Sequence, residues 1–512
     1  MDEKTKEIVE RLTTAAHNNR AEANHGVSVS GHDLDEVQKA GKRAVAQTHD
    51  DAKAYQITRR GRGMANRTDP YQARARELAA VAGLDPDGKI DRPGQRPMPV
   101  WCTFRDAARQ EHLAREAAEA AKEIASLRPQ EPRYQSSPLT IIGQHDDATI
   151  AQMKNCMAVG NAVAGVICAD GHLGYAQPVG GVIAYEKQIS ISGVGFDIGC
   201  GNMAVRLDTP FSAIEDRVGE IIRDVSKVVS FGIGRNNEER VEHELFDDAE
   251  AWKESDMESY RQKAVGQLGT VGGGNHYVDL MRDEDGFVWI GVHFGSRGFG
   301  HTSSTRYLKA AGGQDGINVP PAVVDEDSEI GRRYIAAMQL AGRYSYAGRE
   351  WVVERVRKII GGNITDMVHN HHNYAWRETH DGKELWVVRK GATPAFPGQR
   401  GFVGGSMGDD AVILEGVDSP EAKASLYSTV HGAGRLFGRK EAKRRFTKSE
   451  MDAWLQSRGV TLIGADLDES PMAYRRLDDV LAYHTASTRV LHRLRPFAVV
   501  MAGEAEFDPW KD

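Results

Sequence analysis

The chain has 512 residues, of which 27% are charged and 7% aromatic, and its formal net charge at pH 7 is −8. This balance argues against a basic coat for general nucleic-acid binding, so an RNA partner would need a local basic site. The four cysteines, Cys102, Cys156, Cys168 and Cys200, form no CxxC pair, which argues against a disulfide scaffold or a zinc ribbon and favours the reducing cytoplasm.

Residues 1–135 predict a helical N-terminal extension that ends in a linker. The first residues, MDEKTKEIVERL, are charged where a secretory signal would be apolar. The stretch 106–127 is rich in Ala, Arg and Glu, as is typical of a helix, and the segment RPQEPRYQSSP at 128–138 holds three prolines. No stretch of the chain approaches the roughly 20 apolar residues of a membrane span. We therefore expect a cytoplasmic protein that makes no contact with a membrane.

Residues 136–512 predict a second, α+β domain. Helical patterns cover 212–229 and 330–360, and they alternate with short β-rich runs: GVICAD, GGVIAYE, FVWIGVHF, ELWVVRK and AVILEG. No repeat of solenoid length is present. Mixed β-sheets covered by helices are the expected architecture.

An acid and a thiol, Asp197 and Cys200, stand three residues apart in the glycine-rich segment GVGFDIGCGN (193–202). Both side chains could face one metal ion, and this pair of ligands suits Mn²⁺, Zn²⁺ or Co²⁺ better than Mg²⁺. Taken alone, the motif is more typical of a small buried cysteine beside a turn aspartate than of a metal site.

Two histidines follow in further glycine-rich segments. His276 ends LGTVGGGNH (268–276), after Asn275, and His293 lies in VHFGSRGFG (292–300). Glycine neighbours offer few side chains for packing, and such turns can expose backbone N–H groups to phosphate. Each histidine is therefore a candidate ligand.

The segment DMVHNHHNY (366–374) has three histidines in four positions, which indicates either a metal site or a solvated surface. With the preceding motifs, the metal site is favoured. Five candidate ligands result, about what two adjacent ions sharing a bridging thiolate would need. They are Asp197, Cys200, His276, His293 and His372.

Two later segments indicate phosphate chemistry. RKGATPAFPG (389–398) and GGSMG (404–408) suit nucleotide recognition. A hairpin with exposed basic residues at its base, without any function, would have the same sequence pattern. In STVHGAGR (428–435), glycines leave the imidazole of His431 open to a bulky electrophile, and a histidine nucleophile attacking a nucleoside triphosphate would form a phosphoramidate. The basic run after it, 439–448, predicts contact with RNA phosphates or a solvated face.

In this order the motifs resemble those of the RtcB family of RNA ligases, over roughly residues 139–502. DGHLG (170–174) with PVGG (178–181) is similar to an early family motif, and PMAY (471–474) to a late one. The resemblance implies an RtcB-like catalytic domain with mixed β-sheets around a metal-lined cleft. It implies joining of RNA ends that carry a 2′,3′-cyclic phosphate or 3′-phosphate to 5′-hydroxyl ends, with GTP and Mn²⁺. Some members also use a small activating partner, archease.

Carried over by position, the five ligands bind the metals, with Cys200 as the bridge, and His431 accepts the guanylate. The positions implied to surround the nucleotide are Asn275, Asp279, Asn373, Ser406, Gly432, Ala433, Gly434 and Tyr474. GMP then passes to the RNA 3′-phosphate and is displaced by the 5′-hydroxyl.

The chain departs from the family at two of its positions. Asp279 stands where the family usually has a glutamate, and Met501 stands where it has a C-terminal lysine that reaches the nucleotide. Lys511 or Arg435 could compensate for the missing charge. Two alternative functions therefore stay open: a binuclear metallophosphoesterase acting on RNA ends, which would not need His431, and an RNA-binding sensor on a degenerate ligase scaffold.

Overall fold

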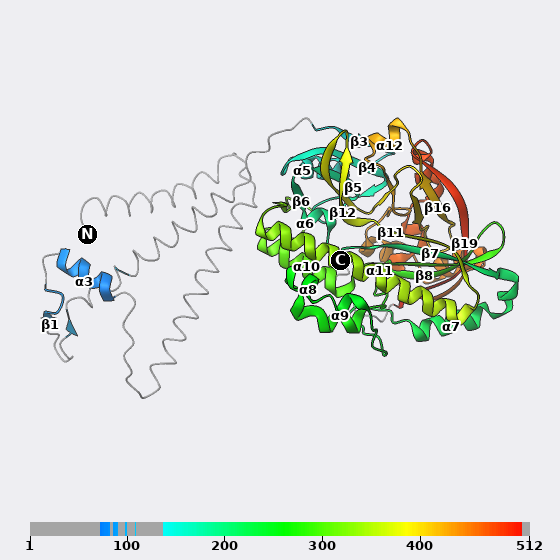
Figure 1. Ribbon diagram of the computed structural model, residues 1–512, viewed down its shortest axis with the longest axis horizontal. Helices are drawn as coiled ribbons and strands as arrows, with labels where there is room; N and C mark the ends of the chain where they lie inside the picture. The colour runs from blue at the N-terminus through cyan, green and yellow to red at the C-terminus, as the bar shows by residue number, and fades with distance from the viewer. Residues whose placement is uncertain (1–71, 82–84, 91–97, 100–107, 109–136, 504–512) are drawn as a thin grey trace. The chain divides into compact units, whose positions relative to one another are not determined.

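The computed structural model describes residues 72–81, 85–90, 98–99, 108 and 137–503 (Figure 1). The chain divides into two compact units, Met1–Arg128 and Pro129–Asp512. The expected domain boundary after residue 135 stays a prediction.

In the first unit, helix α3 (Gln72–Val81) buries Ala75 and Ala79. Two short strands, β1 (Lys89–Ile90) and β2 (Met98–Pro99), pair antiparallel. The helix expected over 106–127 lies outside the described residues except for Ala108.

An eight-stranded sheet forms the centre of the second unit, with strand order β11-β7-β9-β8-β19-β16-β15 and β18 paired to β19. The β18–β19 pair is parallel and the other neighbours are antiparallel, so the sheet is mixed. The strands are β7 (Gly201–Pro210), β8 (Tyr277–Arg282), β9 (Phe287–Phe294), β11 (Ile364–His371), β15 (Arg400–Val403), β16 (Ala411–Gly416), β18 (Thr461–Ala465) and β19 (Thr488–Gly503).

A five-stranded sheet of order β12-β13-β5-β4-β3 lies beside it. Its strands are β3 (Leu139–Ile141), β4 (Ala162–His172), β5 (Val179–Tyr185), β12 (Asn373–His380) and β13 (Lys383–Lys390). One residue, His372, separates β11 of the large sheet from β12 of the small one. Two small ribbons pair β6 (Gln188–Ser190) with β10 (Val323–Asp325) and β14 (Ala392–Pro394) with β17 (Ser428–Val430).

Helices cover one face of the large sheet, where α11 (Glu329–Ile360) runs beside α7 (Val218–Val228) (Figure 1). Val353 of α11 and Ile222 of α7 share a buried cluster with Val205, Ile290 and Val292 of the strands. The other α-helices are α5 (Asp147–Met157), α6 (Ile191–Val194), α8 (Ala249–Glu254), α9 (Arg261–Gln267), α10 (Arg297–Ala310), α12 (Pro420–Ala424), α13 (Arg439–Arg445), α14 (Lys448–Arg458) and α15 (Leu477–Leu481).

The expected α+β class is confirmed. All five β-rich runs lie in strands, and the helical pattern at 330–360 corresponds to α11. The pattern at 212–229 is less regular, because two 3-10 turns, Phe211–Ala213 and Glu215–Arg217, precede α7. Within the described residues, no helix has the length and apolar character required to cross a membrane.

Candidate functional site

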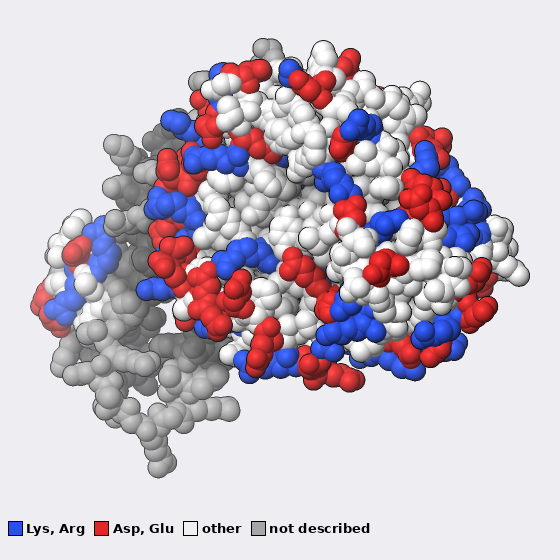
Figure 2. Space-filling model, turned by 45° about the vertical axis from the view of Figure 1, so that its right-hand side comes forward, with Lys and Arg blue, Asp and Glu red and all other residues white. Residues whose placement is uncertain are grey.

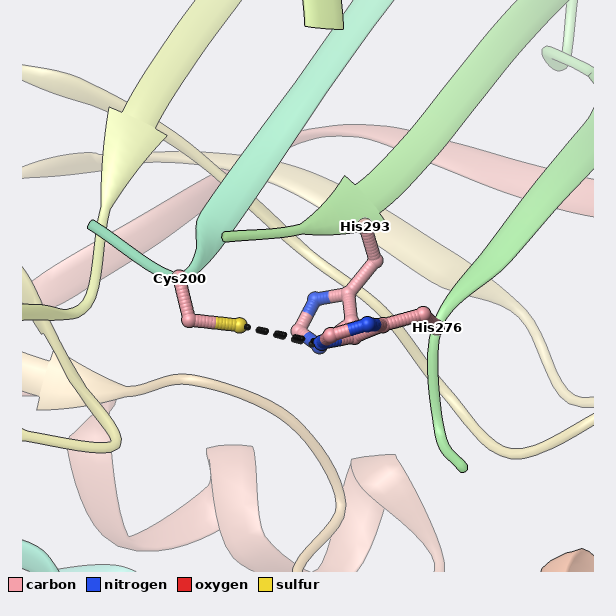
Figure 3. A group of neighbouring side chains, drawn as sticks. All are labelled: Cys200, His276 and His293. Atoms are coloured by element: carbon pink, nitrogen blue, oxygen red, sulfur yellow. Dashed lines mark hydrogen bonds between the residues drawn. The ribbon is translucent and has the colours of Figure 1, made fainter. Parts of the chain in front are cut away.

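Three of the expected metal ligands meet at the ends of three neighbouring strands of the large sheet (Figure 3). Cys200 directly precedes β7, His276 precedes β8, and His293 lies near the end of β9. The register pairs His293 with Asn202 on one side and with Tyr277 on the other. The strand order β7-β9-β8 therefore brings together residues that are far apart in the sequence.

The cluster has the size of a divalent metal site. The Sγ atom of Cys200 lies 3.6 Å from the Nε2 atoms of both His276 and His293. Sulfur and nitrogen ligands at about 2.3 and 2.0 Å from a tetrahedrally bound zinc ion would lie roughly 3.6 Å apart. Burial raises the pKa of the Cys200 thiol well above its usual range, and the Asp197 carboxylate adds to the rise. A bound divalent ion would displace that proton.

Hydrogen bonds direct both imidazoles toward this point. Nδ1 of His293 lies 2.6 Å from Oδ1 of Asn202, and Nδ1 of His276 lies 3.1 Å from the carbonyl oxygen of Val271. The Nδ1–H of His293 donates to Asn202, so Nε2 of His293 keeps a lone pair for a metal. Nδ1 of His276 also lies 3.1 Å from Nη1 of Arg297, which is a donor. Burial also lowers the pKa of His293 well below its usual value, which keeps the ring neutral.

Asp197 and His372 border this cluster without belonging to its closest group. Oδ2 of Asp197 lies 3.0 Å from Nε2 of His276. Burial alone would raise the pKa of Asp197, but the hydrogen bond and charge of His276 lower it to about 2. The His372 ring stacks on His293 at 5.1 Å between centroids, and its buried Nδ1 has no hydrogen-bond partner among the described residues. An orphaned buried nitrogen here fits an additional ligand.

Arg349 of α11, which sequence analysis missed, binds the backbone next to Cys200 and His293. Its fully buried guanidinium donates to the carbonyl oxygens of Gly199 and Phe294, at 3.0 and 2.6 Å. It also contacts ring nitrogens of His369 and His371, at 2.9 and 3.0 Å. Two of the three histidines in the 366–374 segment therefore bind Arg349. No sequence signal could have found this arginine, since a cation on a helix normally indicates a solvated face.

His431 follows β17 and faces a buried carboxylate that the sequence analysis gave no role. Oδ2 of Asp170 lies 2.6 Å from Nδ1 of His431 and also accepts the backbone N–H groups of His431 and Gly432, at 2.9 and 3.3 Å. Burial would raise the pKa of Asp170, but the charge and hydrogen bonds of His431 lower it. The His431 ring lies 5.1 Å from that of His372, so the histidine adjoins the metal cluster.

Most of the residues expected around a nucleotide lie on loops, whereas Asp279 lies in β8 and Asn373 begins β12. A β-bridge joins Gly404 to Gly432, close to Ser406, and another joins Arg435 to Tyr474. Asn373 uses its Oδ1 to accept the backbone N–H of Gly391 at 2.7 Å, and Asn275 is exposed at the start of β8. Gly434 has φ 75°, a conformation that glycine adopts without strain, and a Cβ atom there would lie 2.4 Å from the Asp170 carbonyl oxygen.

A family model described as tRNA-splicing ligase RtcB matches residues 152–502. The chain belongs to the RtcB family. It is 31% identical to the tRNA-splicing ligase RtcB of Thermococcus kodakarensis, over 69% of this chain and 91% of the relative. The RNA-splicing ligases RtcB of Escherichia coli K12 and Mycobacterium tuberculosis are each 30% identical over 65% of this chain, covering 89% and 95% of the relatives.

The two departures from the RtcB pattern lie on one face of the large sheet. Met501 is the cross-strand partner of Tyr277, and Val499 is that of Asp279. Met501 is 5% exposed in an apolar cluster with Met407 and Val499. Burial raises the pKa of Asp279 to about 8, and its Oδ1 has no hydrogen-bond partner among the described residues. A carboxyl group and a methionine thus lie on the same face of the large sheet.

Neither proposed substitute for the family lysine is evident. Lys511 lies outside the described residues. Nη1 of Arg435 lies 2.7 Å from the Tyr474 hydroxyl and 3.2 Å from Glu469, so this guanidinium already has two side-chain partners.

The basic run at 439–448 is partly neutralised within its own surface. Arg444 and Arg445 of α13 both pair with Glu441, and Lys448 pairs with Asp452. Positive and negative side chains are mixed over the face in Figure 2. Contact between this run and RNA phosphates stays a prediction.

Proposed function

We propose that this chain joins RNA ends bearing a 2′,3′-cyclic phosphate or 3′-phosphate to 5′-hydroxyl ends, using GTP and Mn²⁺. One observation carries the proposal: His431 is held by a buried carboxylate, beside a cluster that fits a divalent metal. Because Nδ1 faces Asp170, the Nε2 atom of His431 bears the lone pair and is the nucleophile. A metallophosphoesterase would not need this arrangement.

Water must first hydrolyse a 2′,3′-cyclic phosphate end to a 3′-phosphate, and three displacements then follow in this proposal. Nε2 of His431 attacks the α-phosphorus of GTP, a P–N bond forms, and pyrophosphate leaves. An oxygen of the RNA 3′-phosphate then attacks the same phosphorus, which breaks the P–N bond, restores His431 and leaves RNA-3′-pp-G. Finally the RNA 5′-hydroxyl attacks the 3′-phosphorus, loses its proton and displaces GMP. Asp170 stabilises the imidazolium character that develops on His431 in the first step.

The proposed metal residues are Cys200, His276 and His293, completed by Asp197 and by His372. This mixed set of sulfur, nitrogen and oxygen ligands suits Mn²⁺, and these residues would hold the two proposed ions. Bound ions would polarise the phosphate groups and offset the charge that develops on them.

The guanylate would lie among the loops that meet beside His431. Ser406, Gly432, Ala433, Gly434 and Tyr474 belong to loops joined by β-bridges, and Asn275, Asp279 and Asn373 complete the proposed set. RNA with the stated ends is the proposed partner, and archease is a proposed activator, as for some members of the family. We also keep the cytoplasm as the proposed location.

Transfer of label from α-³²P-GTP to the protein tests the function directly. We expect an adduct that is labile in acid and stable in alkali, as a phosphoramidate should be, and we expect His431→Ala to lose it. His492→Ala is the matched control, because His492 is a part-exposed histidine that pairs with Glu284 on another surface. Phosphate release from RNA ends without an adduct would favour the hydrolase, and RNA binding without either activity would favour the sensor.

A further inference from the structure

Asn202 of β7 uses both ends of its side-chain amide. The side chain is fully buried, and its cross-strand partners are His293 of β9 on one side and Asn370 of β11 on the other. Its Oδ1 lies 2.6 Å from Nδ1 of His293, and its Nδ2 donates to the carbonyl oxygen of Phe402 at 2.8 Å. One amide therefore connects a proposed metal ligand to strand β15.

The chemistry of the two partners fixes the direction of the amide. The carbonyl oxygen of Phe402 can only accept a hydrogen bond, so the NH₂ group of Asn202 must face it. The amide oxygen then faces His293, whose Nδ1 must carry the proton. The lone pair of His293 is therefore on Nε2, the atom that lies 3.6 Å from Sγ of Cys200.

At Phe402, two side chains take the place of a neighbouring strand. Strand β15 stands at the end of the strand order of the large sheet, where it pairs with β16. The backbone N–H of Phe402 donates to Oδ1 of Asn370 at 3.0 Å, while its carbonyl oxygen accepts from Asn202. Because Phe402 is buried, its backbone groups need these partners. The position of β15 consequently depends on the two asparagines.

Strand β15 leads to the loop of the proposed nucleophile. Two residues after Phe402, Gly404 forms a β-bridge with Gly432, the residue that follows this nucleophile. Tyr277 gives a second connection between the metal cluster and the same point. Its ring stacks on His293 at 5.2 Å between centroids, and a Cβ atom at Gly404 would overlap its hydroxyl group. Two side chains thus connect one metal ligand to this segment.

A metal ion on Nε2 of His293 would act through the amide of Asn202. Metal binding draws electron density from the imidazole, so its Nδ1–H becomes a stronger donor to the amide oxygen. The polarised amide then donates more strongly to Phe402, because hydrogen bonds in a chain strengthen one another. The ion also fixes the plane of the ring, and with it the position of the amide.

We propose that Asn202 is a positioning residue that couples metal binding to the segment 402–408, which contains Ser406 of the proposed nucleotide site. Metal binding orders this segment, and by linkage a nucleotide that orders the segment strengthens metal binding. The inference rests on the proposed function. It gives the metal site a second role, which is to prepare the nucleotide site before GTP arrives.

Hydrogen–deuterium exchange of the full chain, measured with and without Mn²⁺, tests this coupling in the absence of GTP. In the wild type, saturating Mn²⁺ should slow exchange in peptides covering 402–408 by roughly fivefold or more. A parallel titration with Mn²⁺ gives the dissociation constant of each variant. Asn161→Asp is the matched control, because Asn161 is an exposed asparagine that precedes β4.

Two variants separate the two ends of the amide. Asn202→Asp keeps an acceptor for His293 but has no donor for Phe402, so Mn²⁺ affinity should stay near the wild-type value while the slowing at 402–408 is lost. Asn202→Leu removes both contacts, so Mn²⁺ should bind roughly 10–100-fold more weakly, without slowing at 402–408 even at saturation. A residue needed only for packing would lose Mn²⁺ affinity equally in both variants.

Retained slowing in Asn202→Asp overturns the inference, and so does retained slowing in Asn202→Leu if the first variant does not fold. Equal losses of Mn²⁺ affinity in the two variants overturn it as well. A wild type that binds Mn²⁺ without slower exchange at 402–408 overturns the inference but leaves the proposed ligase function intact. A wild type that does not bind Mn²⁺ overturns both.

Discussion

In the proposed mechanism, the contact between Asp170 and His431 decides which nitrogen of the imidazole attacks GTP. A carboxylate 2.6 Å from Nδ1 favours the tautomer with the proton on that nitrogen, which would leave Nε2 as the proposed nucleophile. We expect Asp170→Asn to form the guanylate adduct about two to four orders of magnitude more slowly, because an amide neither fixes the tautomer nor stabilises the imidazolium. Single-turnover labelling measures this rate, with the exposed acid Asp418 changed to Asn as control. An unchanged rate would remove Asp170 from the mechanism.

Asp279 should make stability depend on pH. Its folded pKa of about 8 lies above the ordinary value because of burial, so the folded state binds more protons than the unfolded state between those two values. Stability therefore falls as pH rises through that window, by at most about 1.4 kcal/mol per pH unit. Urea unfolding from pH 5 to 8 should show this slope in the wild type and a weaker slope in Asp279→Asn. Equal slopes in the two proteins would contradict the prediction.

Met501 limits how well the chain uses GTP, in our interpretation. Met501→Lys should strengthen GTP binding by roughly one order of magnitude, because it adds a cation near Asp279 and the proposed base. In an Asp279→Asn background the same change should strengthen GTP binding less, since an amide cannot ionise to become the counter-charge of the buried ammonium. Calorimetric titration with GTP of the wild type, the two single variants and the double variant measures this coupling. A loss of affinity in Met501→Lys alone would show that the apolar cluster does not admit the charge.

The order of the strands, which no sequence pattern predicts, brings the candidate metal ligands together. Cys200→Ala should weaken Mn²⁺ binding by more than roughly 100-fold, because changes to mere supporting residues of metal sites already cost 10–100-fold. Cys168→Ala is the matched control, since Cys168 is also a buried free cysteine but lies in a separate apolar cluster. Titration of both variants with Mn²⁺ measures this difference in affinity. Unaltered binding in Cys200→Ala would disprove the assignment.

The elements could largely be predicted, whereas their contacts could not. Runs such as FVWIGVHF matched β9 because a short, continuous apolar run with β-branched and aromatic side chains is a local signal. The five candidate ligands were predicted from glycine-rich and histidine-rich motifs, and the resemblance to a family added their roles. The structure adds what connects distant segments: Arg349 against Gly199 and Phe294, Asp170 against His431, and Asn202 between His293 and Phe402. Each depends on tertiary packing, so a single sequence contains no pattern for it.

At the scale of the molecule, all the proposed site residues belong to the unit Pro129–Asp512, and the family match covers 152–502 within it. The large sheet supplies the metal cluster, while β4 of the small sheet supplies Asp170. His372, the one residue between β11 and β12, connects the two. The site thus depends on how both sheets are joined.

The candidate metal ligands lie far apart in the sequence, so metal binding should depend on folding. His276 and His293 are 76 and 93 residues from Cys200, and closing such loops in an unfolded chain costs entropy that a few ligand atoms do not repay. An ion should therefore bind almost exclusively to the folded chain. At a concentration about 100 times its dissociation constant, it would add roughly 2.7 kcal/mol to the free energy of unfolding. The thermal unfolding midpoint should rise with Mn²⁺ concentration and return on chelation, and Cys200→Ala should respond to neither.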